Sequence, residues 1–164
     1  MVLNRWSDIA LLCLLIRIGM VKTFKRNVMK IFRELLVYHH SSLEYRAKIL
    51  TLMISANGEI CECEKQKLKE IAYTIYHDDQ DRAELLIDAV LEYHIKIITN
   101  NGLDFEHLVQ QVQRETKEVK RFSEKIDIGL LMQLHECMDN EEDILFQKRI
   151  LEFLQSLKEE YGEV

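Results

Sequence analysis

The chain of 164 residues is long enough for one domain with its own hydrophobic core, and occasionally for two small ones. It contains no proline and only five glycines, with 48% hydrophobic and 30% charged residues. Because proline and glycine punctuate most strands and tight turns, this composition excludes sandwiches, barrels and phosphate-cradling α/β folds, and its apolar content excludes a disordered chain. We therefore expect an all-α protein made of helices joined by short turns.

The formal net charge of −6 hides an asymmetry along the chain. Residues 1–50 include nine basic and three acidic residues, a charge of +6, whereas residues 51–164 include 13 and 25, a charge of −12. The stretch from Arg17 to Arg33 holds six of the basic residues and no acidic one. The sequence predicts basic N-terminal helices, residues 1–38, packed on a helical body, residues 39–164, as a single domain overall.

An apolar run opens the chain from Ile9 to Val21, and Arg17 interrupts it. Its length is below the roughly 20 residues that a membrane-spanning helix needs, so we expect a buried first helix. Contact of residues 9–21 with a membrane is the alternative, because basic residues directly after an apolar stretch are typical of a cytoplasmic membrane flank.

Residues 20–38 predict a basic amphipathic helix, with apolar side chains at three- and four-residue steps. Its basic residues lie mostly off that stripe: Lys22, Lys25, Arg26, Lys30 and Arg33. We expect this basic face to pack against the acidic body or a protein partner. The alternatives are binding to an anionic membrane surface and binding to nucleic acid, which the acidic body disfavours because it would repel the phosphates.

Apolar periodicity predicts six further helices in the body. Their apolar stripes cover residues 43–54, 68–75, 86–97, 105–119, 126–138 and 146–157. Asn57-Gly58 should end the first of them, because these residue types most readily adopt the left-handed conformation that ends a helix. The clearest loop is Asn100-Asn101-Gly102. We expect a compact bundle of seven or eight helices.

Two helix pairs, residues 43–77 and 124–161, look like a degenerate two-fold internal repeat. Each has an apolar helix, a short acidic turn and a second, amphipathic helix. In the first turn Cys61 stands where an N-cap belongs and Glu64 at the third helical position, which predicts a capping box. In the second turn we expect Asp139 and Glu142 to fill the same two roles.

The stretch from Leu50 to Glu64 resembles the signature of TerB-like domains: an apolar helix, then alanine, aspartate, glycine, any residue, an apolar residue and, four positions later, glutamate. The corresponding positions are Ala56, Asn57, Gly58, Glu59, Ile60 and Glu64. The chain departs from the signature at Asn57, in place of aspartate, and at Cys61, in place of the usual serine or threonine. The resemblance covers roughly residues 40–160.

This resemblance implies an all-helical domain of two related halves, found in tellurite-resistance and stress proteins and before the J domain of DjlA-type membrane-anchored co-chaperones. The His-Pro-Asp triplet of a J domain is absent from this proline-free chain, and so are a phosphate loop, a nucleophile elbow and a dinucleotide fingerprint. We therefore expect a bacterial, cytoplasmic, non-enzymatic module that acts through a protein partner, at the inner face of the membrane if its basic helix binds there. The oligomeric state stays open.

The acidic turns suggest a divalent-cation sensor as the alternative function. Calcium or magnesium would take carboxylates from both turns: Glu59, Glu62, Asp139, Glu141, Glu142 and Asp143. If the aspartate of the signature helps to bind a cation, Asn57 removes one charge from that site. The competing interpretation of these residues is a solvated acidic face.

A softer metal such as zinc is a further alternative, provided that the repeat brings the two turns together. Its ligands would be Cys61, Cys63, His135 and Cys137. We expect reduced, cytosolic thiols instead, because the sequence has no recognisable cleavable secretory signal and a chain of this size needs no disulfides.

Overall fold

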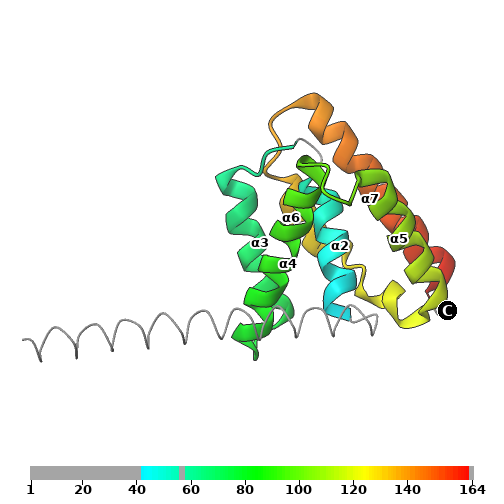
Figure 1. The fold of residues 1–164 in the computed structure, drawn as a ribbon. Helices are drawn as coiled ribbons and strands as arrows, with labels where there is room; N and C mark the ends of the chain where they lie inside the picture. The colour runs from blue at the N-terminus through cyan, green and yellow to red at the C-terminus, as the bar shows by residue number, and fades with distance from the viewer. Residues whose placement is uncertain (1–41, 56–57, 163–164) are drawn as a thin grey trace, which may run out of the picture. The chain divides into compact units, whose positions relative to one another are not determined.

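Six α-helices and one 3-10 helix make up the residues that the computed structural model describes, 42–55 and 58–162 (Figure 1). They are α2 (Ser42–Ile54), α3 (Glu62–Ile75), α4 (Gln80–Ile98), α5 (Phe105–Glu118), η1 (Lys120–Lys125), α6 (Ile128–His135) and α7 (Glu141–Tyr161). These residues contain no strand, so the predicted all-α class is confirmed. The predictions for residues 1–38, including the apolar run and the basic helix, lie outside the described residues.

The core is built around α2. Ten of its 13 residues are buried, and it contacts α4, α5, α6, α7 and η1. In Figure 1 it stands in the middle of the described helices, with α3 and α4 to one side and α5 and α7 to the other. A helix that is apolar nearly all round has to be covered on every side, and each fully buried large apolar side chain contributes about 1.5–3 kcal/mol.

Polar side chains on α2 are buried together with partners on neighbouring helices. The Tyr45 hydroxyl donates to Thr116 Oγ1 on α5 at 2.5 Å, since the Thr116 hydroxyl itself donates to the carbonyl of Val112. Lys48 forms an ion pair with Glu115, also on α5. These contacts satisfy groups that would be costly to bury alone, and they fix how α5 lies along α2.

Left-handed residues appear at the predicted turns. Gly58, with a φ of +81°, follows the end of α2, and Asn100 and Gly102, with φ of +50° and +80°, form the loop between α4 and α5. Both predicted loops are confirmed, although Asn57 itself lies outside the described residues. No helix in the described part of the chain is long and apolar enough to cross a membrane.

The caps of α3 and α7 differ. Cys61 and Glu64 form the predicted capping box at α3. At α7 the prediction was wrong: Asn140, not Asp139, is the N-cap, and its Oδ1 accepts the backbone N–H of Glu142 at 2.8 Å. The helix begins one residue later than predicted, so Glu142 stands at the second helical position, where it cannot close a capping box.

The segment between α5 and α7 also differs from the prediction. α6 covers only Ile128–His135, and η1 precedes it where no element was predicted. Phe122 of η1 is fully buried, and its ring stacks on Tyr45 of α2 with centroids 4.4 Å apart. A six-residue 3-10 helix has too few turns to give a periodic signal, so only its packing reveals it.

Candidate functional site

The turn that carries the TerB-like signature leads from α2 into α3. Gly58 and Glu59 are exposed, Ile60 is half-buried and Glu64 is completely buried, while Ala56 and Asn57 lie outside the described residues. The backbone N–H of Glu64 donates to Cys61 Sγ at 3.4 Å, and the backbone N–H of Cys61 donates to Glu64 Oε2 at 3.0 Å. The glutamate of the signature therefore starts a helix, and its carboxylate faces inward.

Burial leaves one oxygen of this carboxylate without a partner. Glu64 Oε1 has no hydrogen bond in the described structure. Burial raises the pKa of Glu64, the two hydrogen bonds with Cys61 lower it, and the nearby Asp143 of α7 raises it further. An ionised Glu64 is thus costly in the folded protein, because water is excluded and a second carboxylate is close.

The two acidic turns approach each other through a disulfide. Cys63, in the first turn of α3, is bonded to Cys137, which follows α6, and their Cα atoms lie 5.7 Å apart. This Cα separation is usual for a disulfide. The prediction of reduced thiols is wrong for these two cysteines, whereas Cys61 is free and exposed. Because 74 positions separate the bonded pair, no local pattern could have paired them.

With the disulfide formed, residues proposed as ligands for a soft metal have other partners. Two of the four are joined in the disulfide. His135 Nδ1 lies 3.1 Å from Gln147 Oε1, and the Gln147 amide donates to the carbonyl of Met53 at 2.9 Å. Disulfide sulfurs are not thiolates, and metal binding by cysteine requires the thiolate. The soft-metal hypothesis would therefore need the bond to be reduced first.

The carboxylates proposed for a harder cation lie along exposed helix starts. Glu62 pairs with Lys65 at 2.5 Å, and Glu59, Asp139, Glu141 and Glu142 are exposed. Within residues 42–55 and 58–162, no three His, Cys, Asp or Glu side chains are grouped so that they could hold a metal ion. The alternative interpretation, a solvated acidic face, describes most of these side chains.

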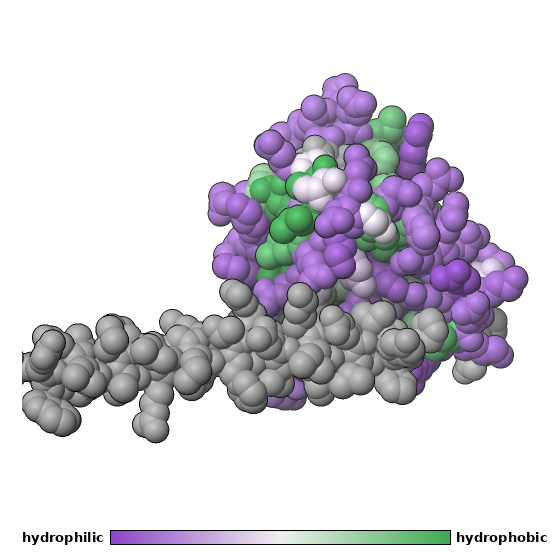
Figure 2. Space-filling model, in the orientation of Figure 1, coloured by the Kyte–Doolittle hydropathy of each residue, from purple (hydrophilic) through white to green (hydrophobic). Residues whose placement is uncertain are grey.

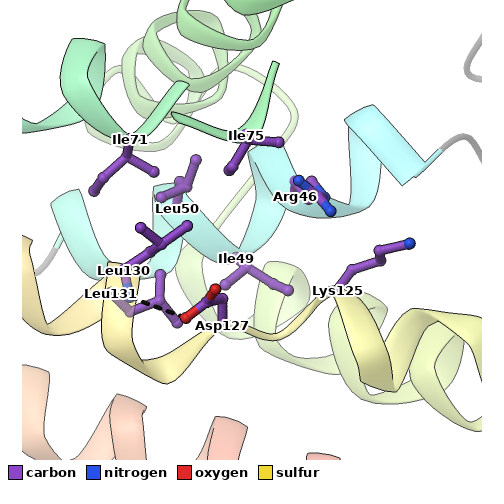
Figure 3. A pocket seen from close by; sticks show the side chains of 9 residues that line it. All are labelled: Arg46, Ile49, Leu50, Ile71, Ile75, Lys125, Asp127, Leu130 and Leu131. Carbon is purple, nitrogen blue, oxygen red and sulfur yellow. Dashed lines mark hydrogen bonds between the residues drawn. The ribbon is translucent and has the colours of Figure 1, made fainter. Parts of the chain in front are cut away.

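A shallow hollow, with about 260 Å³ of space that includes open solvent, lies between α2, α3 and the segment from η1 into α6 (Figure 3). It is lined by Arg46, Ile49, Leu50, Ile71, Ile75, Lys125, Asp127, Leu130 and Leu131. Six of these nine side chains are aliphatic, and helices supply the apolar lining. The enclosed part of this space is only about 20 Å³, far below the roughly 300–1,000 Å³ of pockets that enclose drug-sized ligands.

Two cations border the hollow on the same side. In Figure 3 the nitrogen-bearing ends of Arg46 and Lys125 lie away from Leu50, Ile71 and the two leucines of α6. Arg46 Nε is buried and has no hydrogen-bond partner among residues 42–55 and 58–162, and its guanidinium lies 5.8 Å from the ring centroid of Tyr76. Asp127 is already engaged as the N-cap of α6, where it accepts the backbone N–H of Leu130.

Neither cation of the hollow has an ion-pair partner in the part of the chain that the structure describes. Residues 51–164 carry a net charge of −12, so this side of the hollow differs in sign from the body around it. No pattern in the sequence marks Arg46 and Lys125, because they lie 79 positions apart and neither belongs to a recognisable motif.

Other apolar side chains reach the surface without forming a hollow. Figure 2 shows a green area within the mostly hydrophilic face of the described helices. The exposed large apolar residues are Tyr73, Ile95, Ile98, Met132 and Leu145. Scattered exposed apolar residues are normal on soluble proteins, so they indicate no site by themselves.

His94 holds the end of α2 that leads into the signature turn. Its Nδ1 lies 3.0 Å from Ser55 Oγ, and the side chain is buried between α4 and α2. Burial lowers the pKa of His94, and a hydrogen bond with the backbone of Gly58 opposes this effect. The neutral imidazole therefore helps to position the turn, a role that the sequence did not reveal.

No family model matches this chain, and no curated protein or solved structure matches it. The resemblance to TerB-like domains therefore depends on the signature residues alone. The helical bundle agrees with the fold that this resemblance implies, but many unrelated families share such a fold.

Proposed function

We propose that this chain is a non-enzymatic protein-interaction domain that docks a segment of a partner protein in the hollow between α2, α3 and α6. One observation supports the proposal: Arg46 and Lys125 border an aliphatic hollow on one side, in a body that is otherwise acidic. Two cations without ion-pair partners among the described residues are suited to a carboxylate, and an aliphatic lining is suited to an apolar side chain.

The size of the hollow narrows the chemistry of the segment. Because the enclosed volume is only about 20 Å³, an apolar side chain would pack across the lining of the hollow, and a drug-sized metabolite would not be enclosed. We therefore propose an apolar anchor residue with a glutamate or aspartate beside it. Packing one such anchor against an apolar surface is how a small interface concentrates its binding energy.

The resemblance to TerB-like domains suggests where such a partner belongs. We propose a tellurite-resistance-like stress response or a chaperone-linked assembly in the cytoplasm, with the basic helix at residues 20–38 as an additional contact to the body, the partner or an anionic membrane. These assignments depend on the signature residues and the charge distribution in the sequence.

Binding of labelled peptides tests the docking proposal. The probes are nine-residue fluorescent peptides with a central leucine flanked by glutamates, and a matched set in which lysines replace the glutamates. We expect fluorescence anisotropy to give a Kd of roughly 10–100 μM for the first set, a typical range for a single short anchor, and at least about tenfold weaker binding for the second.

The variant Arg46→Glu combined with Lys125→Glu should invert this preference, while Lys158→Glu on α7 should leave it unchanged. Lys158 lies outside the hollow, so its reversal controls for a change of charge elsewhere on the surface, with half the change in net charge of the double variant. Equal binding of the two peptide sets, or no binding of either, would contradict the docking proposal.

A second candidate function is divalent-cation binding at the acidic turns. The observation that favours it is the buried Glu64 Oε1, which has no hydrogen-bond donor in the part of the chain that the structure describes and lies near Asp143. Isothermal titration with calcium, magnesium and zinc tests it, with Glu64→Gln as the variant that should weaken binding. Absence of heat at millimolar concentrations of all three cations removes this candidate.

A further inference from the structure

The Cys63–Cys137 disulfide joins two walls of the hollow. Cys63 belongs to α3, which contributes Ile71 and Ile75, and Cys137 follows α6, which contributes Leu130 and Leu131. The third wall, α2, carries no cysteine. The covalent bond therefore directly joins two of the three walls.

Among the α-helices around the hollow, α3 and α6 bury the smallest fractions of their residues. α3 buries four of its 14 residues and α6 two of its eight, whereas α2 buries ten of 13. Elements with few buried side chains open locally at a smaller cost in free energy than the core does. The disulfide is thus a major restraint on the spacing between α3 and α6.

The two cysteines of the bond differ in their exposure to solvent. Cys63 is an exposed residue in the first turn of α3, whereas Cys137 is only 9% exposed. A thiolate attacks a disulfide at the sulfur that it can reach, and the other sulfur leaves. Reagents in solution should therefore react at Cys63.

We propose that Cys63 is a thiol-exchange site, and that low-molecular-weight thiols of the glutathione class reversibly open the bond to Cys137 and so regulate the hollow. This inference depends on the proposed docking function. When the bond is open, α3 separates more readily from α6, so a partner segment must order the hollow as it binds. Ordering on binding lowers the affinity.

The exchange balances in two steps. A small thiolate attacks Cys63 Sγ and forms a mixed disulfide, the bond between the protein sulfurs breaks, and Cys137 Sγ takes the electron pair and then a proton. A second small thiolate attacks the small-molecule sulfur of the mixed disulfide, which releases Cys63 as a thiol and one oxidised small disulfide. The protein gains two electrons and two protons, and the reverse reaction needs only the oxidised small disulfide.

Cys61 supplies a matched control for this proposal. It is a free, exposed cysteine two residues from Cys63, and its sulfur serves as the N-cap of α3. Serine is a favoured N-cap, so Cys61→Ser should preserve the helix start and the disulfide while removing the neighbouring thiol. Cys137→Ser, by contrast, makes the open state permanent.

The test equilibrates the full chain in mixtures of reduced and oxidised glutathione, blocks free thiols with iodoacetamide and maps the cysteine peptides by mass spectrometry. We expect the Cys63–Cys137 peptide to disappear reversibly as reduced glutathione increases, with glutathione attached at Cys63 in the intermediate. Amide hydrogen exchange in α3 should be at least about tenfold faster in the reduced protein. Cys61→Ser should respond in the same way, whereas Cys137→Ser should show the faster α3 exchange at every glutathione ratio.

The Kd of the glutamate-flanked peptide should rise at least about threefold on reduction. A bond that persists in fully reduced glutathione, or α3 exchange rates that are equal in the two redox states, would overturn the proposal. If no peptide binds in either state, the docking function fails, while mass spectrometry and hydrogen exchange still decide whether the bond is reversible and restrains α3.

Discussion

The helix pairs α2–α3 and α6–α7, which the sequence presents as related halves, occupy different environments in the fold. Both α2 and α6 are apolar helices followed by an acidic turn, yet α2 buries ten of 13 residues and α6 two of eight. α2 is surrounded by five other elements, including α6 and α7. A similar apolar pattern therefore does not determine how deeply a helix is buried, because burial depends on what packs around it.

The turns of the two pairs differ in the same way. The first has a reciprocal capping box that buries Glu64, and the second has a single cap from Asn140 that leaves Glu142 exposed. The disulfide is the covalent link between these unequal turns. Substitutions that separate the contributions of the two pairs can test this comparison.

The largest loss of stability should come from removing the disulfide that links the two helix pairs. Replacing Cys63 and Cys137 together by serine should lower the free energy of unfolding by about 4 kcal/mol, the loop-closure entropy for two cysteines separated by about 75 residues. Urea denaturation followed by circular dichroism measures it, with Cys61→Ser as the control expected to match the unaltered chain. A loss below about 1 kcal/mol would mean that packing alone holds the pairs together.

The next largest loss of stability should come from breaking the buried ion pair that α2 makes through Lys48. Among the residues that the structure describes, α6 makes no such ion pair. Glu115→Ala leaves Lys48 without its partner, and the two side chains are only 7% and 13% exposed. We expect a loss of about 2–3 kcal/mol in the free energy of unfolding, slightly less than for a completely buried pair.

Tyr45→Phe is the matched control for Glu115→Ala, because it removes a neighbouring contact between the same two helices. It should cost at most about 1 kcal/mol, since the Thr116 hydroxyl still donates to Val112 at 2.6 Å. If urea denaturation gives equal losses in the free energy of unfolding for the two variants, the buried ion pair is not what distinguishes α2 from α6.

The two turns should differ in their dependence on pH. Because the pKa of Glu64 is raised in the folded protein, its contribution to stability is complete below about pH 4.5 and is lost as the pH rises through the folded-state pKa. Glu64→Gln keeps an acceptor for the N–H of Cys61 but removes the charge. At pH 7 it should stabilise the protein, by on the order of 1 kcal/mol, and flatten this part of the pH profile.

Glu142→Gln in the second turn is the control for Glu64→Gln, because Glu142 is exposed and makes no capping bond with its side chain. It should leave the pH profile of unfolding unchanged. If the two variants behave alike in urea titrations between pH 4 and pH 8, the distinction between the turns is wrong.

The smallest effect should come from His94, which supports only the first turn. Burial lowers the pKa of His94, so its contribution is present above the ordinary value of 6.5 and is lost as the pH falls through the folded-state pKa. His94→Gln should therefore weaken the loss of stability on acidification below pH 6.5, by up to about 1 kcal/mol. His77→Gln is the exposed control, and a matching change there in urea titrations would refute a specific role for His94.

The sequence alone determined the features that depend on neighbours within about four residues. The absence of proline and the apolar periodicity predicted an all-α chain, the spacing of Cys61 and Glu64 predicted the capping box of α3, and Gly58 and Gly102 marked two turns. Such features follow from backbone sterics and local hydrogen bonding, which the order of residue types expresses directly.

Only the tertiary structure decided which distant residues meet. It paired Cys63 with Cys137, placed Arg46 and Lys125 beside one aliphatic hollow, and stacked a ring of η1 on α2. These contacts join residues more than 70 positions apart, and their formation depends on how all the helices fill the core together. A single sequence specifies which side chains are apolar or charged, but the packing of the whole bundle determines their partners and their exposure to water.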